Sequence, residues 1–123
     1  MLKKRIIFTL HYDKGFFNLS RNFRLQKIGD LNWLLKNYNF LKIAESIDEL
    51  IIIDVSRDNR EHDKFLENVS EITKNIFVPV CLGGGIRTLE YAKKLFESGA
   101  DKINLNTSLF HDPSLVDEIS KTY

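Results

Sequence analysis

Four short apolar runs alternate along this chain with four segments of helical spacing, and that alternation limits the folds open to it more than any other feature. The runs cover residues 6–10, 50–55, 77–82 and 100–106, and each predicts a strand. A segment with apolar residues three or four positions apart follows each run, which indicates an amphipathic helix. Strands that alternate with helices predict a parallel sheet with right-handed crossovers. We therefore expect an α/β fold in which residues 1–123 form a single domain of four βα units.

Four βα units are half of an eight-stranded (β/α) barrel, which typically needs about 250 residues. A half-barrel leaves two strand edges unpaired, and unpaired edges favour association with another chain. Two arrangements follow for residues 1–123. In the first, residues 1–123 are the N-terminal half of a longer barrel. In the second, two copies of the chain pair as a homodimer through their half-barrel edges.

Turn and cap residues mark where the predicted helices begin and end. Asp30 and Thr88 precede apolar stripes and are suitable N-caps. The stripe after Asp30 predicts one helix and consists of Leu31, Leu34, Leu35, Tyr38 and Leu41. Asp112 followed by Pro113 is a third N-cap, with proline at the first helical position. Gly99 stands where a C-terminal glycine belongs. These turn and cap residues support the predicted alternation of strands and helices.

Composition excludes several classes of protein. The formal net charge is only +1, so no overall field favours nucleic acid or a membrane surface. The apolar stretch after Arg5 is about six residues, too short for a signal peptide, and no run approaches the roughly 20 residues of a membrane helix. Cys81 is the single cysteine, which excludes an intramolecular disulfide and a zinc site built on several thiolates. We expect a cytoplasmic protein without a metal or cofactor.

Residues 11–28 show no sustained period and are predicted to form a loop of about 18 residues, a length that is often functional. This segment carries four basic side chains, Lys14, Arg21, Arg24 and Lys27, against one acidic side chain, Asp13. Two interpretations remain open. It is an ordinary solvated loop, or it is a mobile flap over an anionic ligand.

Three consecutive glycines, Gly83 to Gly85, join the third predicted strand to its helix. A turn without Cβ atoms lets main-chain N–H groups approach a ligand closely. The helix that follows adds unpaired N–H groups and the positive end of its dipole, which suits a phosphate. The alternative is a turn whose only need is positive φ.

Polar residues collect at the carboxyl ends of all four predicted strands, the edge where parallel α/β folds place their chemistry. The set is His11, Asp54, the glycine turn, and Asn106 with Thr107 and Ser108. An imidazole, a carboxylate, an anion-binding turn and an amide suit a phosphorylated metabolite. Taken singly, each has a structural alternative: Asp54, Asn106 and Thr107 as turn residues, and His11 as a hydrogen-bonded structural histidine.

The opposite ends of the strands carry charge. Arg5 precedes the first strand, Glu49 precedes the second, and Asp101 and Lys102 open the fourth. These residues predict a ring of alternating charge at the floor of a barrel. Structural salt bridges explain such a ring, and so does a surface on which a partner docks.

In this order, the motifs resemble the cyclase subunit of imidazole glycerol phosphate synthase over all 123 residues, but only over the first half of that family's length. The resemblance rests on Met1-Leu2-Lys3-Lys4-Arg5-Ile6-Ile7, Ile47-Asp48-Glu49-Leu50 with Asp54, Gly83-Gly84-Gly85-Ile86, Gly99-Ala100-Asp101-Lys102 with Asn106-Thr107, and Asp112-Pro113-Ser114-Leu115. The family fold is a (β/α)8, or TIM, barrel made of two similar halves.

The resemblance also implies roles. Gly85, Asn106 and Thr107 would hold one substrate phosphate with support from Gly84, and Asp54 would face the reaction chamber. Arg5, Glu49 and Lys102, next to Asp101, would form a charged gate at the interface with a glutaminase subunit that supplies ammonia. The implied activity is ammonia-dependent lyase and cyclase chemistry in histidine biosynthesis. Its substrate is a phosphoribulosyl formimino carboxamide ribotide.

The chain departs from the family pattern after its first strand. His11 stands where the family has a catalytic aspartate, with Asp13 nearby, and Leu19 replaces a lysine. Histidine acts as a general acid or base near neutral pH, so His11 and Asp54 are the candidate catalytic residues. Half a barrel alone is not expected to turn over substrate.

Residues 19–30, followed by Trp33 and Leu34, resemble a divergent branch of the family linked to surface polysaccharides. That branch is associated with passing ammonia to a separate enzyme that amidates sugars. Two further functions therefore stay open beside the cyclase. They are an ammonia-channelling subunit of this kind and a non-catalytic phosphate-binding half-barrel.

Overall fold

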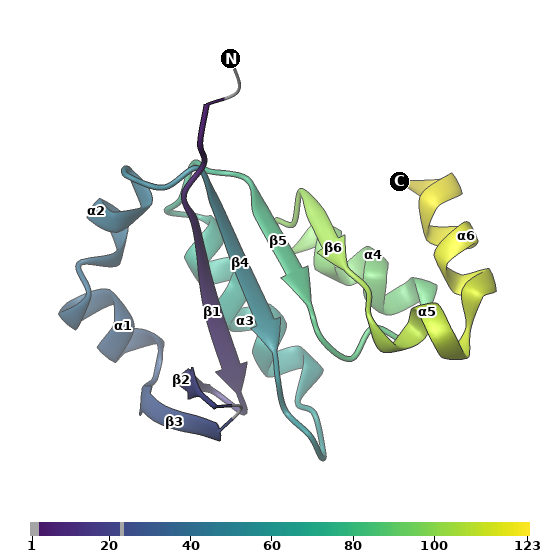
Figure 1. Cartoon of the computed structure of the whole chain (residues 1–123), viewed down its shortest axis with the longest axis horizontal. Coiled ribbons are helices and arrows are strands. Elements are labelled where there is room, and N and C mark those ends of the chain that lie inside the picture. Colours follow the sequence, from purple (N-terminus) through teal and green to yellow (C-terminus); the bar gives the residue numbers. More distant parts are fainter. Residues whose placement is uncertain (1–2, 23) are drawn as a thin grey trace.

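In this computed structural model, helices cover one face of a six-stranded sheet (Figure 1). The structure describes residues 3–22 and 24–123; Met1 and Leu2 of the opening motif, and Phe23 of the predicted loop, lie outside the described residues. No helix in the described part of the chain is long and apolar enough to cross a membrane.

Four of the six strands are parallel neighbours, and a hairpin extends the sheet beside the first of them. The spatial order is β3-β2-β1-β4-β5-β6. The strands are β1 (Ile7–Asp13), β2 (Phe16–Arg21), β3 (Arg24–Gly29), β4 (Glu49–Asp54), β5 (Val80–Gly83) and β6 (Lys102–Asn104). The helices are α1 (Leu31–Asn37), α2 (Phe40–Ala44), α3 (His62–Thr73), α4 (Leu89–Glu97), α5 (Thr107–His111) and α6 (Pro113–Thr122).

The parallel pairing of β1, β4, β5 and β6 confirms the prediction of a (βα)4 half of a TIM barrel. Ile7 pairs with Glu49, and Cys81 pairs with Lys102, so the strands start near one edge of the sheet. Their carboxyl ends meet at the opposite edge. The sheet therefore separates the two groups of polar residues that the sequence assigned to opposite strand ends.

The core lies between this sheet and its helices. α3 and α4 lie behind the parallel strands in Figure 1. Alternate strand residues, among them Leu10, Leu50, Ile52 and Leu82, point to this side and are almost fully buried. Burial of one such side chain stabilises the fold by about 1.5–3 kcal/mol. The apolar runs that predicted strands thus have a physical cause, because every second residue joins the core and residues between them, such as Ile51 and Ile53, are half-buried.

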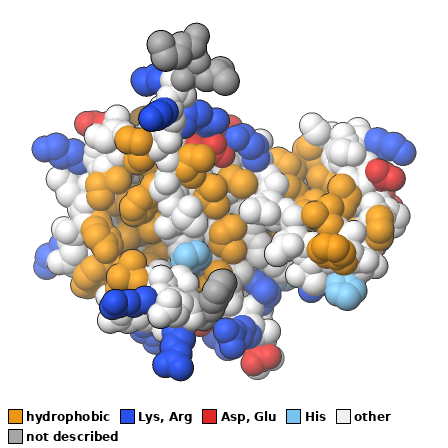
Figure 2. All heavy atoms as spheres, viewed as in Figure 1, with side chains coloured by type: hydrophobic (Ala, Val, Ile, Leu, Met, Phe, Trp, Pro, Cys, Tyr) orange, Lys and Arg blue, Asp and Glu red, His pale blue; other side chains and the backbone are white. Residues whose placement is uncertain are grey.

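No helix of the described residues lies over the other face of the parallel strands (Figure 1). Ile7 is 48% exposed there, and Ile51 and Ile53 are half-buried. Hydrophobic side chains gather over the strands in this view (Figure 2). In a closed barrel this face would be the interior, so its apolar character agrees with a half-barrel.

The described residues of the segment 11–28, predicted as a loop, form strands and turns instead, so that prediction was wrong. β1 continues to Asp13, and β2 returns antiparallel after a two-residue turn at Lys14 and Gly15. Both turn residues have positive φ, 47° and 93°, as a type I′ hairpin requires. Phe17 is 1% exposed, so burial of an aromatic ring holds the hairpin against the sheet. Its basic residues therefore belong to strands and turns of the sheet edge.

The helix predicted from Asp30 through Leu41 is two helices. Asn39 adopts φ +46° between α1 and α2, which ends the first helix. Phe40, fully buried, takes the core position that the sequence stripe gave to Leu41, which is 49% exposed. A left-handed asparagine is compatible with a helical spacing pattern on both sides, so the pattern did not reveal the break.

Two other boundaries differ from the sequence prediction. Phe77, placed in the third strand, is 98% exposed, and β5 begins only after Pro79. The fourth strand is short and is followed at once by α5, which was not predicted. By contrast, the capping predictions are confirmed, because Asp30, Thr88 and Asp112 each accept a main-chain hydrogen bond at the start of a helix.

Candidate functional site

The glycine turn after β5 is held in a conformation that only glycine adopts readily. Gly84 has φ +101° and Gly85 has φ +67°. A Cβ atom on Gly84 would lie 2.1 Å from the carbonyl oxygen of Asp54, and a Cβ atom on Gly85 would lie 2.6 Å from Cδ of Arg60. The turn therefore needs glycine both for its backbone angles and for close packing against the end of β4.

A second wall of the site comes from the segment after β6. Asn106 and Thr107 lead into α5, and both are exposed. Ser108, which is buried, donates a hydrogen bond from its hydroxyl to the carbonyl of Ile86. This bond ties the start of α5 to the segment that follows the glycine turn, so the two walls are held together.

Between these walls lies a cavity of about 350 Å³ at the carboxyl ends of β4, β5 and β6. All four residues predicted to bind phosphate line it, together with one predicted catalytic residue and two arginines: Gly84, Gly85, Asn106, Thr107, Asp54, Arg60 and Arg87. A cavity with main-chain N–H groups, an amide, a hydroxyl and a guanidinium can hold an oxyanion.

Asp54 closes the inner end of this cavity. Its carboxylate is fully buried, and Oδ1 accepts a hydrogen bond of 3.0 Å from the main-chain N–H of Ser56. Arg60 Nη1 lies 3.6 Å from the same oxygen and donates a 2.7 Å hydrogen bond to the main-chain carbonyl of Asp54. Tyr12 is opposite Asp54 in the register, on the helix side of the sheet. Burial, aided by the nearby carboxylate of Asp54, raises the pKa of Tyr12 to about 12.

His11 occupies a different place. It is half-buried in β1 opposite Ile53, on the face of the sheet that no helix covers, and it does not line the cavity. A Cβ atom on Gly83 would lie 3.0 Å from Cβ of Asn104 and 3.2 Å from Cδ1 of Ile53. These positions form one transverse row that starts at His11 and ends at Asn104. Ile53 and Asn104 of this row also line the cavity, so the row joins His11 to the cavity lining.

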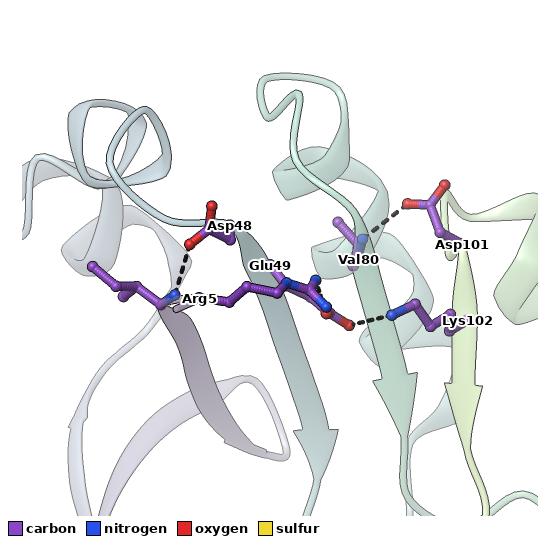
Figure 3. A network of polar contacts seen from close by, with 7 residues as sticks. Arg5, Asp48, Glu49, Val80, Asp101 and Lys102 are labelled. Carbon is purple, nitrogen blue, oxygen red and sulfur yellow. Dashed lines mark hydrogen bonds and ion pairs between the residues drawn. The ribbon is translucent and has the colours of Figure 1, made fainter. Parts of the chain in front are cut away.

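The charged residues at the opposite end form a compact network (Figure 3). The carboxylate of Glu49 is 7% exposed and accepts two hydrogen bonds, 2.8 Å from Arg5 Nη2 and 2.9 Å from Lys102 Nζ. The hydrogen bond from Lys102 is the main cause that lowers the pKa of Glu49, against the effect of burial, and Arg5 adds to it. Three of the four predicted gate residues are therefore in direct contact.

Asp101, the fourth, takes a structural position beside them. Its Oδ2 accepts a 2.8 Å hydrogen bond from the main-chain N–H of Val80. Asp48 does the same for Ile6, the residue before β1, at 2.7 Å. Both aspartates thus hold the main chain where a strand begins, and Asp101 supports the ring without joining its ion pairs (Figure 3).

Arg60 and Arg87 line the cavity, although sequence reasoning gave neither of them a role. Arg60 lies in a polar stretch that reads as a solvated loop, and its place depends on the tertiary approach of Gly85. Ser108 stood in the predicted polar set without a role, and its hydroxyl bond to Ile86 supplies one. Among the described residues, no group of three or more His, Cys, Asp or Glu side chains could hold a metal ion.

The chain is similar in sequence to known proteins. The family model described as "Histidine biosynthesis protein" matches residues 25–123. A protein of Parasynechococcus marenigrum named "Putative imidazole glycerol phosphate synthase subunit hisF2" is 57% identical over 123 residues, which is all of this chain and 46% of that protein. The imidazole glycerol phosphate synthase subunits HisF of Staphylococcus carnosus and Campylobacter jejuni are 38% and 37% identical, and in both cases the match covers all of this chain and 47% of the relative. The chain spans about half the length of the curated relatives it matches.

Proposed function

Because this chain belongs to the histidine biosynthesis protein family, we propose that residues 1–123 form the N-terminal half of a cyclase-type (β/α)8 barrel. The (βα)4 topology and the uncovered apolar face support a second half-barrel as the missing layer. Where no second half-barrel is present, a second copy of this chain would cover the face that carries Ile7, Ile51 and Ile53. Native mass spectrometry of the 123-residue chain, with and without phosphate, tests whether two copies pair. An isolated monomer contradicts that pairing.

The function we propose for the cavity is binding of one phosphate of a phosphorylated substrate. The main support for this proposal is that one cavity is lined by residues from two separate segments, Gly84 and Gly85 after β5 and Asn106 and Thr107 after β6. Positive φ at both glycines turns the main chain sharply at the cavity wall, where main-chain N–H groups bind oxyanions.

We propose that the floor ring of Arg5, Glu49 and Lys102, supported by Asp101, faces a glutaminase subunit that delivers ammonia. The names of the relatives support a partner, because each is called a subunit of a synthase. The ring lies at the strand ends opposite the cavity. Ammonia entering at the floor would reach the phosphate-bearing substrate through the barrel interior.

The proposed reaction is ammonia-dependent lyase and cyclase chemistry on a phosphoribulosyl formimino carboxamide ribotide. Of the two catalytic candidates, His11 is the one that a substrate on the uncovered face can touch, and imidazole transfers protons near neutral pH. Asp54 is fully enclosed, so its charge acts on the cavity chiefly through Arg60.

A second candidate is an ammonia-channelling subunit for amidation of surface-polysaccharide sugars. One observation favours it: His11 replaces the aspartate of the cyclase pattern. This function keeps the floor ring and the phosphate cavity while it gives up cyclisation.

The exchange His11→Asp separates the two functions when it is assayed in a complete barrel with ammonium as nitrogen donor. If cyclisation has been lost through His11 alone, aspartate raises turnover of the ribotide. If the wild-type barrel already turns over the ribotide and His11→Asp abolishes this activity, His11 is itself the acid or base. Turnover by neither form excludes the cyclase and leaves channelling or simple binding.

Gly85→Val tests the phosphate site separately, because a Cβ at this position displaces the Arg60 side chain and strains the turn. Gly99→Ala is the matched control, since Gly99 also has positive φ (113°) but lies at the strand starts beside Thr73. Loss of phosphate-ester binding in Gly85→Val, with binding kept in Gly99→Ala, supports the site. Equal affinity in both variants would show that the glycine turn is only structural.

A further inference from the structure

Arg60 lies between the buried carboxylate of Asp54 and the cavity, and the comparisons and the sequence pattern assign it no role. We propose that Arg60 is an anion-binding residue of the phosphate site and that Asp54 is its positioning residue. This inference rests on the proposed phosphate site and adds to it a full positive charge supplied by the loop after β4.

Two contacts fix the direction in which the Arg60 guanidinium points. Its Nη1 donates to the main-chain carbonyl of Asp54 at 2.7 Å and lies 3.6 Å from Oδ1 of the same residue. On the other side, the side chain passes over Gly85 so closely that a Cβ there would lie 2.6 Å from Cδ and 2.8 Å from Nε. The guanidinium is therefore held against the glycine turn, at the wall of the cavity.

The guanidinium keeps donors free for a ligand. Arginine carries five N–H donors, and the hydrogen bonds of Arg60 in the described structure use Nη1 alone. The side chain is 30% exposed and lines the cavity together with Gly84, Gly85 and Thr107. A planar donor group next to main-chain N–H groups matches the geometry of a phosphate, which arginine binds through two parallel bonds.

The charge of Asp54 explains why this arginine stays in place without its ligand. Arg60 is the only cation within ion-pair distance of Asp54 among the described residues, and Oδ2 of Asp54 has no hydrogen-bond partner there. A buried carboxylate left without its counter-charge is strongly destabilising. The pair therefore keeps Arg60 pointed at the glycine turn and lets a phosphate act as its second anionic partner.

The chain offers variants that separate binding from folding. Arg60→Gln alone leaves Asp54 buried and uncompensated, so it can fail to fold. Asp54→Asn with Arg60→Gln removes both charges and leaves a polar amide at each position, and Asp54→Asn alone is its reference. Arg60→Lys keeps the charge without the planar fork. Arg57→Gln is the matched control, because Arg57 is an exposed arginine of the same loop that does not line the cavity.

In the experiment, each 123-residue variant is titrated with inorganic phosphate while NMR records the signals of its main-chain N–H and arginine Nε–H groups. Circular dichroism is the folding control. We expect the double variant to bind phosphate at least about tenfold more weakly than Asp54→Asn, as loss of a charge-assisted hydrogen bond requires. The phosphate affinity of Arg60→Lys is expected to lie between those of the double variant and Asp54→Asn. The phosphate affinity of Arg57→Gln is expected to match that of wild type. The Nε–H signal of Arg60 shifts on titration.

Two outcomes overturn the inference in different ways. If the double variant and Asp54→Asn bind phosphate equally, and the Nε–H signal of Arg60 does not move, Arg60 is only the structural partner of Asp54 and the phosphate site stands without it. If wild type itself binds no phosphate, the proposed phosphate site fails, and the role of Arg60 fails with it.

Discussion

The floor ring yields a stability prediction whose size follows from its geometry. Glu49→Gln keeps the shape of the side chain and removes the charge that Arg5 and Lys102 contact at 2.8 and 2.9 Å. A hydrogen bond to a charged group is worth about 1.5–3 kcal/mol. Because the two cations are 53% and 54% exposed, solvent screening reduces the sum for both bonds to about 2 kcal/mol. For a chain of this length that loss lowers the melting temperature by about 6–10 °C.

The pH dependence of this loss identifies its cause. The hydrogen bond from Lys102, with help from Arg5, lowers the pKa of Glu49 in the folded state. A lowered folded pKa gives stability that is complete above the unfolded pKa of about 4.3 and is lost as the pH falls through the folded value. The difference between wild type and Glu49→Gln is therefore largest at neutral pH and narrows below about pH 4.3.

Thermal and urea unfolding of both proteins at a series of pH values measures this difference. Glu90→Gln is the control, because Glu90 is 81% exposed and its pair with Lys94 spans 4.0 Å. We expect that control to match wild type throughout. Equal stability of Glu49→Gln and wild type at neutral pH, or a difference that persists unchanged into acid, would refute the reasoning.

Three further predictions test the fold and the site. Gly84→Ala puts a Cβ 2.1 Å from the Asp54 carbonyl at φ +101°, so we expect a loss of roughly 3 kcal/mol or more in urea unfolding; stability near wild type would contradict this packing. Asp30→Ala removes the side-chain cap that Trp33 N–H donates to at 2.9 Å, and is expected to cost about 1 kcal/mol, while Asp30→Asn restores most of it. Burial raises the pKa of Tyr12 to about 12, so its phenolate absorbance is expected to appear near that pH and later than that of free tyrosine, which Tyr12→Phe assigns by difference; ionisation near pH 10 would show that the ring is open to solvent.

Local signals predicted the parallel part of the fold well. Apolar runs that alternate with helical stripes predicted the order of the parallel strands and their helices along the chain. The prediction succeeded because these apolar residues occupy the core in the structure. Caps such as Asp30 and Thr88 were predictable, because a short polar side chain before a stripe has one favoured local role. The meeting of Gly84, Gly85, Asn106 and Thr107 at one cavity was also predictable, because the carboxyl ends of parallel strands lie at the same end of the sheet.

What sequence reasoning missed depends on tertiary contacts. The hairpin of β2 and β3 was invisible because the turn pair Lys14-Gly15 lacks the asparagine or aspartate of the strongest hairpin signals. The break at Asn39 left the helical spacing intact. Arg60 carries no motif, and its place in the cavity is set by the absence of a side chain on Gly85. Each of these depends on what packs against the residue.

One measurement tests the central claim of a phosphate-binding half-barrel most directly. It is a map of main-chain amide shifts while inorganic phosphate is titrated into the 123-residue chain. The account predicts that Gly84, Gly85, Asn106 and Thr107 shift together with one dissociation constant, while Gly99 at the opposite edge stays still. Shifts that are absent from these four amides, or that gather at the floor ring instead, would contradict it.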